Sequence, residues 1–516
     1  MSLNNGFKFS SLQIILFGVF TFFISCKPVI YEELPKPVVE PGQAILSGRI
    51  LNFQLDQEET GSTLSLAVPN PVTAEPGYFE TTINADGSFR FEVPVECNKI
   101  IGGLNSSLFN QTILVNLTTI NEVLLELNID KNDNAIVSSS EGMEFSSDDM
   151  VYSLETLGKM IHHVSPERIP RYNMLIEDFI PFEIKSLERK LDIAKNDTAL
   201  SDQAKAFITN EFKLLYLDIR FLDYADAMKL DFIKYNDYED WDKFTAVEPD
   251  MSYYSLLEYF DLNNPHYLYN EGYSKILQKI LANSTLNIPP IMDTSVEDWL
   301  KDVKKKIAAC IGSDKGLFYD LLAANAYVKQ FNSELKPLTD RQKENIIKYF
   351  KNEGITKILI KKNEEIIKLV EKQLQTRSNL INTPFVPKEN LMDSIIYEYK
   401  GKSILVDLWA TWCAPCLDAM TANEKVLQEI KGENIVILYI TDSTSPRKLW
   451  EQKIKLIEGE HYYLTSYEFN SILESNGLTG IPSYLFYDKN GNLLSKTQGY
   501  PGQIKMKEMI KDLLQK

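Results

Sequence analysis

Two cysteines in the last quarter of the chain, Cys413 and Cys416, are separated by two residues and come shortly after an apolar segment at 404–408. The segment is typical of a buried strand and the residues after the pair are typical of a helix, so both thiols are expected at a helix N-terminus. Free N–H groups and the helix dipole favour a thiolate there, and thiol pKa values in such motifs fall from ~8.5 to about 3.5–7.5. The spacing predicts thiol–disulfide exchange, with Cys413 as the more exposed nucleophile and Cys416 as the resolving thiol.

The same cysteine pair has two other chemical interpretations. A zinc site needs two more ligands, but the sequence has no second C-x-x-C motif, and His461, the one histidine after residue 379, has no partner at ligand spacing. A peroxidase of the peroxiredoxin type has Thr three positions before its reactive cysteine, where this chain has Ala410. We therefore expect a dithiol enzyme that uses no metal and no organic cofactor.

The cysteine pair belongs to a longer motif. Residues 404–416 read ILVDLWATWCAPC, which resembles the active-site stretch of thioredoxins. Residues 480–491 read GIPSYLFYDKNG, which resembles the cis-proline strand of that family and the hairpin after it. The two motifs stand in the family's order, and with the N-terminal leader described below they fit its anchored, TlpA-like branch. The resemblance covers about 380–516, roughly a quarter of the chain.

The resemblance implies roles for further residues. Asp407 matches the buried carboxylate that exchanges a proton with the inner cysteine; without the resemblance, it would be interpreted as a strand-end acid facing water. Pro482 matches the cis-proline that packs against the cysteine pair, and the backbone of Ile481 is expected to pair with a substrate strand. The other expected substrate contacts lie beside the sulfurs: Trp412, which would cover them or simply pack there, and Ala414 and Pro415.

The N-terminus has the features of an export signal. Lys8 precedes an apolar segment, Leu12 to Ile24, which is shorter than the ~20 residues of a spanning helix. Phe23-Ile24-Ser25-Cys26 resembles a bacterial lipobox, which implies removal of residues 1–25 and lipidation of Cys26; an uncleaved anchor or a plain secretory signal is the alternative. Residues 26–41, with four prolines, then form a tether. We expect a cell-envelope protein that is lipid-anchored and faces the periplasm, more in the outer than the inner membrane because Lys27 is not the Asp of inner-membrane retention.

The rest of the chain divides by pattern into three regions. Residues 42–145 are β-rich, and Asn84 to Gly87 predicts a hairpin, so an antiparallel sandwich-like domain is expected. Its expected strands are Ala44–Phe53, Thr63–Val68, Tyr78–Ile83, Ser88–Val93, Ile113–Leu117 and Val123–Ile129. Residues 146–378 follow helical spacing without a fixed repeat, which predicts an irregular all-α domain.

Helix boundaries within the second region are predicted from capping residues. Ser201 is expected to cap a helix that continues to Leu222, and Thr339 to cap one that ends at Gly354. Residues 366–374 indicate a last helix. Residues 379–516 return to strands alternating with helices, which completes a multidomain α/β chain with a C-terminal thioredoxin fold.

Composition limits the function of the whole chain. Its 516 residues carry 72 acidic and 54 basic side chains, a net charge of −18, which disfavours nucleic acid as a partner. Cys97 and Cys310 stand alone in different regions, either as buried apolar residues or as a cross-domain disulfide. Asp130 to Asn134 imitates a calcium loop but lacks the required glycine, so a polar inter-domain loop is favoured.

Two functions are consistent with these features. The first is a membrane-anchored thiol–disulfide oxidoreductase that acts on disulfide-containing proteins and takes electrons from a membrane electron-donor protein. Its Ala-Pro dipeptide is close to the Gly-Pro of thioredoxin, which favours a reductase over an oxidase. The alternative is a surface lipoprotein that binds peptides or glycans and has an auxiliary thioredoxin domain. A cluster of tyrosines could form its binding platform or pack in a core: Tyr253, Tyr254, Tyr259, Tyr267, Tyr269 and Tyr273.

Overall fold

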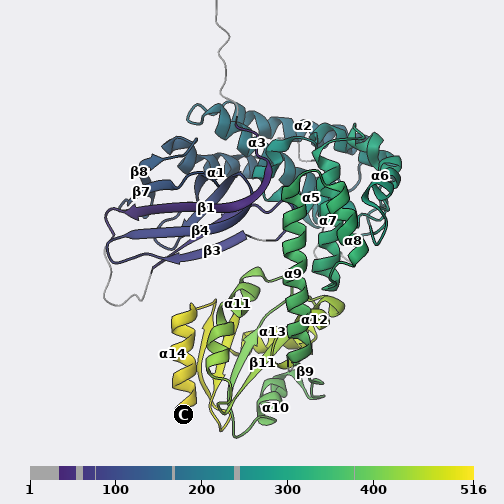
Figure 1. Ribbon diagram of the computed structural model, residues 1–516. Helices are drawn as coiled ribbons and strands as arrows, with labels where there is room; N and C mark the ends of the chain where they lie inside the picture. Colours follow the sequence, from purple (N-terminus) through teal and green to yellow (C-terminus); the bar gives the residue numbers. More distant parts are fainter. Residues whose placement is uncertain (1–33, 54–61, 76, 165–168, 237–243, 377) are drawn as a thin grey trace, which may run out of the picture.

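The computed structural model describes residues 34–53, 62–75, 77–164, 169–236, 244–376 and 378–516. In chain order it contains a domain of two β-sheets, a helical region and a C-terminal α/β unit (Figure 1). This agrees with the expected multidomain α/β fold class. The expected export signal and Cys26 lie outside the described residues. Within the described ranges, no helix combines the length and apolar character that a bilayer span needs.

The first domain contains eight strands in two four-stranded sheets. One sheet has the order β4-β1-β7-β8 and the other β3-β2-β5-β6. The six expected strands are present, and two more were missed. The strands are β1 (Val39–Ile50), β2 (Thr63–Val68), β3 (Gly77–Thr82), β4 (Ser88–Cys97), β5 (Lys99–Ser106), β6 (Ile113–Thr118), β7 (Val123–Ile129) and β8 (Ala135–Glu141).

Two details of the predicted sandwich are wrong. The turn at Asn84–Gly87 forms, because the Gly87 N–H donates to the Asn84 carbonyl at 2.8 Å, but it joins strands of different sheets. The Ile50 N–H donates to the Gly87 carbonyl, so β4 pairs with β1 instead of β3. The sheets are also not wholly antiparallel, since β1 and β7 run parallel. The loop at 130–134 joins β7 to β8 and is therefore not an inter-domain loop.

The central region is helical, as expected. Its elements are α1 (Ser147–His162), α2 (Ile176–Lys195), α3 (Asp202–Tyr216), η1 (Leu217–Leu222), α4 (Tyr224–Tyr235), η3 (Met251–Phe260), η4 (Pro265–Tyr269), α5 (Gly272–Ala282), α6 (Val296–Ile311), α7 (Leu317–Glu334), α8 (Asp340–Tyr349) and α9 (Glu353–Gln375). Ser201 and Thr339 cap α3 and α8 with their side-chain oxygens, which confirms both predicted starts.

The predicted end of α8 at Gly354 is wrong. The helix ends at Tyr349, and Gly354 lies in the first turn of α9 instead. A Cβ atom at this position would overlap the carbonyl oxygen of Val39 on β1. Glycine therefore permits α9 to begin directly against the edge of the first domain.

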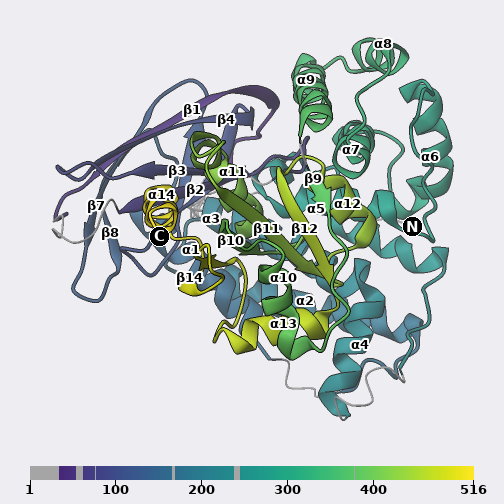
Figure 2. The ribbon, with the colours of Figure 1, turned by 90° about the horizontal axis from the view of Figure 1, so that it is seen from below.

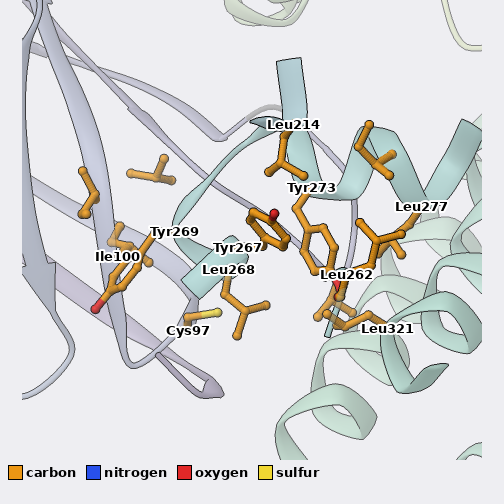
Figure 3. Packing of buried hydrophobic residues seen from close by; sticks show 14 of the residues in the cluster. Cys97, Ile100, Leu214, Leu262, Tyr267, Leu268, Tyr269, Tyr273, Leu277 and Leu321 are labelled. Atoms are coloured by element: carbon orange, nitrogen blue, oxygen red, sulfur yellow. The ribbon is translucent and has the colours of Figure 1, made fainter. Parts of the chain in front are cut away.

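The tyrosine cluster is part of the core and not a surface platform. Five of its six members are buried, and only Tyr259 is substantially exposed. Figure 3 shows Tyr267 and Tyr273 side by side among leucines, with Tyr269 nearer the sheet domain and Cys97. Their hydroxyls donate to the backbone carbonyls of Phe260, Leu262 and Pro35, respectively. The aromatic side chains therefore join the sheet domain to the helices.

The C-terminal unit is one six-stranded sheet, ordered β14-β13-β10-β11-β12-β9, between two helical layers. Its elements are β9 (Ser378–Leu380), η5 (Lys388–Asn390), α10 (Leu391–Tyr397), β10 (Ser403–Leu408), α11 (Ala414–Glu429), β11 (Ile435–Asp442), α12 (Arg447–Ile454), β12 (Gly459–Leu464), α13 (Ser466–Ser475), β13 (Ser483–Tyr487), β14 (Leu493–Gln498) and α14 (Gln503–Leu514). Strands β9 to β12 are parallel, while β13 and β14 form the expected antiparallel hairpin.

The two faces of this sheet have different helices. Alternate residues of β10, β11 and β13 pack with α10 and α13, and the intervening residues pack with α11, α12 and α14. Figure 2, viewed from below, shows α11 on one side of the sheet and α10 and α13 on the other. Helix α9 extends from the helical region along the C-terminal unit (Figure 1), where its Lys372 forms an ion pair with Glu424 on α11.

Candidate redox site

The expected cysteine pair forms a disulfide at the start of α11. The Sγ atoms of Cys413 and Cys416 are 1.98 Å apart and their Cα atoms 5.3 Å apart. Cys413 is the N-cap residue of the helix, and its Sγ accepts a hydrogen bond from the Cys416 N–H at 3.3 Å. Cys413 is 4% exposed and Cys416 is 0% exposed. Cys413 is therefore the slightly more exposed of the two residues, although both are buried.

The strand before the helix positions the cysteine pair. All six residues of β10 are buried, because helices cover both faces of the sheet. Beyond the strand, the Trp409 N–H donates to the Ile440 carbonyl at 3.0 Å and the Thr411 N–H donates to the Ser445 Oγ at 3.0 Å. These bonds tie the turn between β10 and α11 to β11 and to the loop after it. The helix N-terminus is thus held at the carboxyl end of two parallel strands.

The Ile481–Pro482 segment lies beside the disulfide. The peptide bond between these residues is cis, as the resemblance implied. The Pro482 carbonyl accepts a hydrogen bond from the Gly499 N–H at 2.8 Å, and Ile481 packs against the buried cluster that contains both cysteines. The cis-proline segment and the dithiol therefore form adjacent parts of one site.

Asp407 is the only carboxylate on β10, and it lies in the interior. The residue is 5% exposed, and burial raises the pKa of its carboxyl to about 8. Among the described residues, its Oδ1 has no hydrogen-bond partner. The interpretation of Asp407 as a strand-end acid facing water is therefore wrong, while its proposed part in proton transfer stays a prediction.

Comparison with known proteins identifies the unit that contains this site. Residues 392–514 match a family model described as a thioredoxin-like domain. The C-terminal part of the chain is a thioredoxin-like domain. The match covers less than a quarter of the chain and does not extend to the sheet domain or to the central helices.

Curated relatives match the same part of the chain. Over 120 residues the chain is 20% identical to "Thiol-disulfide oxidoreductase ResA" of Bacillus thuringiensis, which covers 22% of this chain and 66% of that protein. It is 41% identical over 44 residues to "Thioredoxin-like protein YneN" of Bacillus subtilis, covering 8% of this chain and 26% of that protein. The chain thus spans slightly less than two thirds of the length of the first of these relatives.

Solved structures match this domain as well. One is the thioredoxin domain of a thiol-disulfide oxidoreductase from Bacteroides vulgatus, with 20% identity and a TM-score of 0.20, covering 22% of this chain and 82% of that one. Another is a thiol:disulfide interchange protein from Chlorobium tepidum, with 21% identity and a TM-score of 0.20, covering 23% of this chain and 83% of that one.

The rim of the site in the thioredoxin-like domain is open to solvent. Trp412 is 62% exposed, and its indole Nε1 donates to the Thr444 Oγ1 at 2.9 Å. The Thr444 hydroxyl in turn donates to Asp442 Oδ1 at 2.5 Å. Ala414 and Pro415 are also exposed, so three of the four residues expected to contact substrate are accessible next to the buried cysteines, and the fourth, Ile481, is half-buried. The anchoring of the Trp412 ring by the loop after β11 was not predicted.

The alignment of three ionisable residues with Asp407 across the sheet was not predicted from the sequence. Tyr484 on β13 and Tyr439 on β11 lie opposite Asp407 in register, and His461 on β12 lies opposite Tyr439. All four side chains are buried. Burial lowers the pKa of His461 to about 4, and its ring stacks on that of Tyr439 with centroids 5.1 Å apart. Tyr484, Tyr439 and His461 each lie inside an apolar segment. Their alignment with Asp407 depends on strand register, which the local sequence does not reveal.

The other candidate residues do not join the thioredoxin-like site. Cys97 and Cys310 are both buried and free, so the cross-domain disulfide considered above is not formed. Burial raises the pKa of each thiol. Among the described residues, no group of three or more His, Cys, Asp or Glu side chains has an arrangement that could hold a metal ion.

Proposed function

We propose that the chain is a thiol–disulfide oxidoreductase whose reactive centre is the Cys413–Cys416 pair. The supporting observation is the disulfide between these residues at the N-terminus of α11, beside the Ile481–Pro482 segment. A pair that forms a disulfide in a folded domain, with one sulfur nearer the surface, has the geometry for thiol–disulfide exchange. The names of the curated relatives support the same chemistry.

The reductive reaction proceeds in two exchange steps. The Cys413 thiolate attacks one sulfur of a substrate disulfide, forming a mixed disulfide and releasing the other substrate sulfur as a thiolate. The Cys416 thiol then loses its proton to the Asp407 carboxylate, and its sulfur attacks the Cys413 Sγ. The second substrate thiolate leaves with the electron pair of the broken bond. The substrate has gained two electrons and the enzyme has become the disulfide, which a dithiol donor must reduce again.

The proposed location is the cell envelope. The export signal at 1–25 and the lipobox at Cys26 support a lipid-anchored protein that faces the periplasm, in the outer membrane more than the inner. Its substrates would be proteins with disulfides, and its reductant a membrane electron-donor protein. Radiolabelled fatty acid incorporation in the producing cell tests the anchor: labelling that persists in Cys26→Ala would contradict it.

The alternative binding function loses its candidate surface. A peptide- or glycan-binding platform needs exposed aromatic rings, but five of the six clustered tyrosines are buried and three of their hydroxyls bond to backbone carbonyls. We therefore propose the oxidoreductase alone.

Insulin reduction by the protein without residues 1–26 tests the enzymatic proposal. With dithiothreitol as electron source, the parent should accelerate precipitation of the insulin B chain, and Cys413→Ser should lose this activity. Cys97→Ser is the matched control, because it removes a buried free thiol far from the site and should remain active. Equal rates for the parent and Cys413→Ser would refute the proposal. Cys416→Ser should accumulate a mixed disulfide with the substrate, visible by non-reducing electrophoresis.

A further inference from the structure

A row of buried ionisable side chains crosses the thioredoxin-like sheet beneath α11. In order across β13, β10, β11 and β12, the row consists of Tyr484, Asp407, Tyr439 and His461. Directly opposed residues on neighbouring strands project to the same face, with Cβ atoms about 4.5–5.5 Å apart. Asp407 therefore has a tyrosine on each side, and the face that bears all three side chains is covered by α11, α12 and α14.

Three polar atoms in this row lack partners among the described residues, and one of them, the Nδ1 of His461, lies two strands away from Asp407. The Oδ1 of Asp407 and the hydroxyl of Tyr484 are both inaccessible to solvent and accept or donate no hydrogen bond to any described residue. Buried polar groups in folded proteins are nearly always hydrogen-bonded, so two orphaned atoms on opposed residues point to a functional arrangement. A carboxylic acid and a phenol are also complementary, because the ionised carboxylate accepts and the phenol donates.

We propose that Tyr484 and Tyr439 are positioning residues whose hydroxyls flank the Asp407 carboxyl and set the pH at which it accepts the proton of Cys416. This inference rests on the proposed oxidoreductase function. Cys416 packs in the same buried cluster as Tyr439, and Tyr439 lies opposite Asp407 in register, so the inner thiol and the acid share this tyrosine as a neighbour. In the resolving step, the S–H bond of Cys416 breaks and an O–H bond forms on Asp407, while the Cys416 sulfur bonds to the Cys413 sulfur and the bond from Cys413 to the substrate sulfur breaks, releasing the substrate thiolate.

The direction of the tyrosine effect follows from the charge of the carboxylate. A hydrogen bond from a neutral phenol to an ionised carboxylate stabilises the charged form, which lowers the carboxyl pKa. Burial acts in the opposite direction and is the main cause of the raised pKa of Asp407. In the structure neither hydroxyl donates to the Asp407 carboxyl. The proposed bond forms when the carboxyl ionises, and it then limits how far burial raises this pKa, so that removal of a hydroxyl raises the pKa further.

Other titratable groups lie around the row, and they do not replace the two phenols. His461, beyond Tyr439, stays neutral near pH 7 because burial lowers its pKa to about 4. Tyr500, which approaches Tyr484, donates its hydroxyl to the Asn423 Oδ1 on α11. Glu458, near Tyr439, is paired with Lys431 at 2.9 Å. Among the described residues, the two tyrosines are therefore the ionisable groups opposite Asp407 on the neighbouring strands.

Tyrosine-to-phenylalanine substitutions test the proposal, because they remove one oxygen and keep the ring. Tyr484→Phe is the first variant and Tyr439→Phe the second. Tyr487→Phe is the matched control, since Tyr487 is also buried on β13 but packs on the opposite face, with α10 and α13. Each protein is the chain without residues 1–26, and circular dichroism verifies that the variants fold.

Carboxyl NMR of the oxidised protein gives a readout that needs no enzymatic turnover. In protein labelled with 13C at the aspartate carboxyl carbon, the Asp407 resonance is assigned by its loss in Asp407→Asn. Its titration midpoint should rise by about one pH unit in Tyr484→Phe, rise in Tyr439→Phe and stay unchanged in Tyr487→Phe. Equal midpoints in Tyr484→Phe, Tyr439→Phe and the parent would overturn the proposal.

The pH profile of insulin reduction connects the midpoint to the reaction. Because Asp407 acts as the base, the rate of insulin reduction should fall at pH values below its pKa. In Tyr484→Phe this acidic limb of the profile should shift to higher pH by the same one unit or so, which makes the variant about tenfold slower than the parent at pH 7. An active parent whose profile is unchanged in Tyr484→Phe would overturn the inference alone. A parent inactive at every pH would instead refute the proposed function.

Discussion

Lys372 on α9 and Glu424 on α11 form an ion pair, with Nζ 2.5 Å from Oε1, between the central helical region and the thioredoxin-like domain. Both side chains are a little more than 40% exposed. A pair this accessible is screened by water and salt and contributes about 0.2–1 kcal/mol. It therefore adds little to the stability of the contact between the two parts.

The double-mutant cycle of this ion pair should give a coupling free energy below about 1 kcal/mol. The variants are Lys372→Ala, Glu424→Ala and the combination, compared by urea unfolding at low and at high salt. The coupling should fall further in high salt because the charges are screened. A coupling of several kcal/mol would show that the pair is desolvated in solution.

Replacement of Asp407 should stabilise the protein at neutral pH. The folded-state pKa of about 8 lies above the usual value of 3.8, so the folded protein retains a proton that the unfolded chain releases. The contribution of protonated Asp407 to stability is therefore fully present below about pH 4 and is lost as the pH rises to about 8. Asp407→Asn removes this loss and should raise the free energy of unfolding at pH 7 by on the order of 4 kcal/mol.

Urea unfolding of the oxidised protein at pH 4 and pH 8 checks this prediction. The advantage of Asp407→Asn should be large at pH 8 and nearly absent at pH 4. Asp512→Asn on α14 is the control, since Asp512 is exposed and its substitution should have a small effect at both values. An advantage of the same size at both pH values would contradict the assigned protonation state.

His461 should make the protein sensitive to acid. Burial lowers its pKa from 6.5 to about 4, so the unfolded chain binds a proton that the folded protein excludes. Stability due to neutral His461 is present above pH 6.5 and is lost as the pH falls towards 4. Between pH 6.5 and 4.5 the parent should lose about 2 kcal/mol more than His461→Phe.

Urea unfolding at several pH values measures this difference, and His163→Gln serves as the control because His163 is exposed. The contribution of Asp407 has the opposite sign in the same range but is common to the parent and both histidine variants, so it cancels in the comparison. Identical slopes of unfolding free energy against pH for the parent and His461→Phe would show that His461 is already charged or accessible.

Substitution by alanine should change the stability of the protein in opposite directions at two glycines. At Gly354 the added methyl group would overlap the Val39 carbonyl oxygen, so α9 or β1 must move and Gly354→Ala should destabilise the protein by more than about 2 kcal/mol. At Gly158, within α1, an added Cβ would have no atom within 4 Å, so Gly158→Ala should stabilise by about 0.5–1 kcal/mol. Thermal unfolding of both variants tests the pair, and destabilisation by Gly158→Ala would contradict the described environment of α1.

Local sequence predicted the elements better than their pairing. The turn at Asn84–Gly87 forms as its residues indicate, yet β3 and β4 enter different sheets, because the β4 edge pairs with β1 from far earlier in the chain. The parallel β1–β7 pair is likewise set by packing between distant segments. Strand alternation identifies a buried face, but it does not select the neighbour across the ladder.

The candidate site shows the same division. Cys413, Cys416, Asp407 and Pro482 occur in short motifs, so their positions could be predicted from adjacent residues. Tyr439 and Tyr484 lie beside Asp407, and His461 beside Tyr439, only through the register of four strands. The Thr444 bond to Trp412 depends similarly on how the loop after β11 approaches the helix.

The length of helix α9 determines where the dithiol lies relative to the sheet domain. As 23 residues of continuous helix, it spans about 35 Å, beginning against the sheet domain and ending beside the thioredoxin-like domain. Inserting one residue would advance its far end by about 1.5 Å and swing it through about 100°. A single residue inserted in α9 would therefore turn the Cys413 sulfur to a different direction relative to the sheet domain while leaving each domain intact.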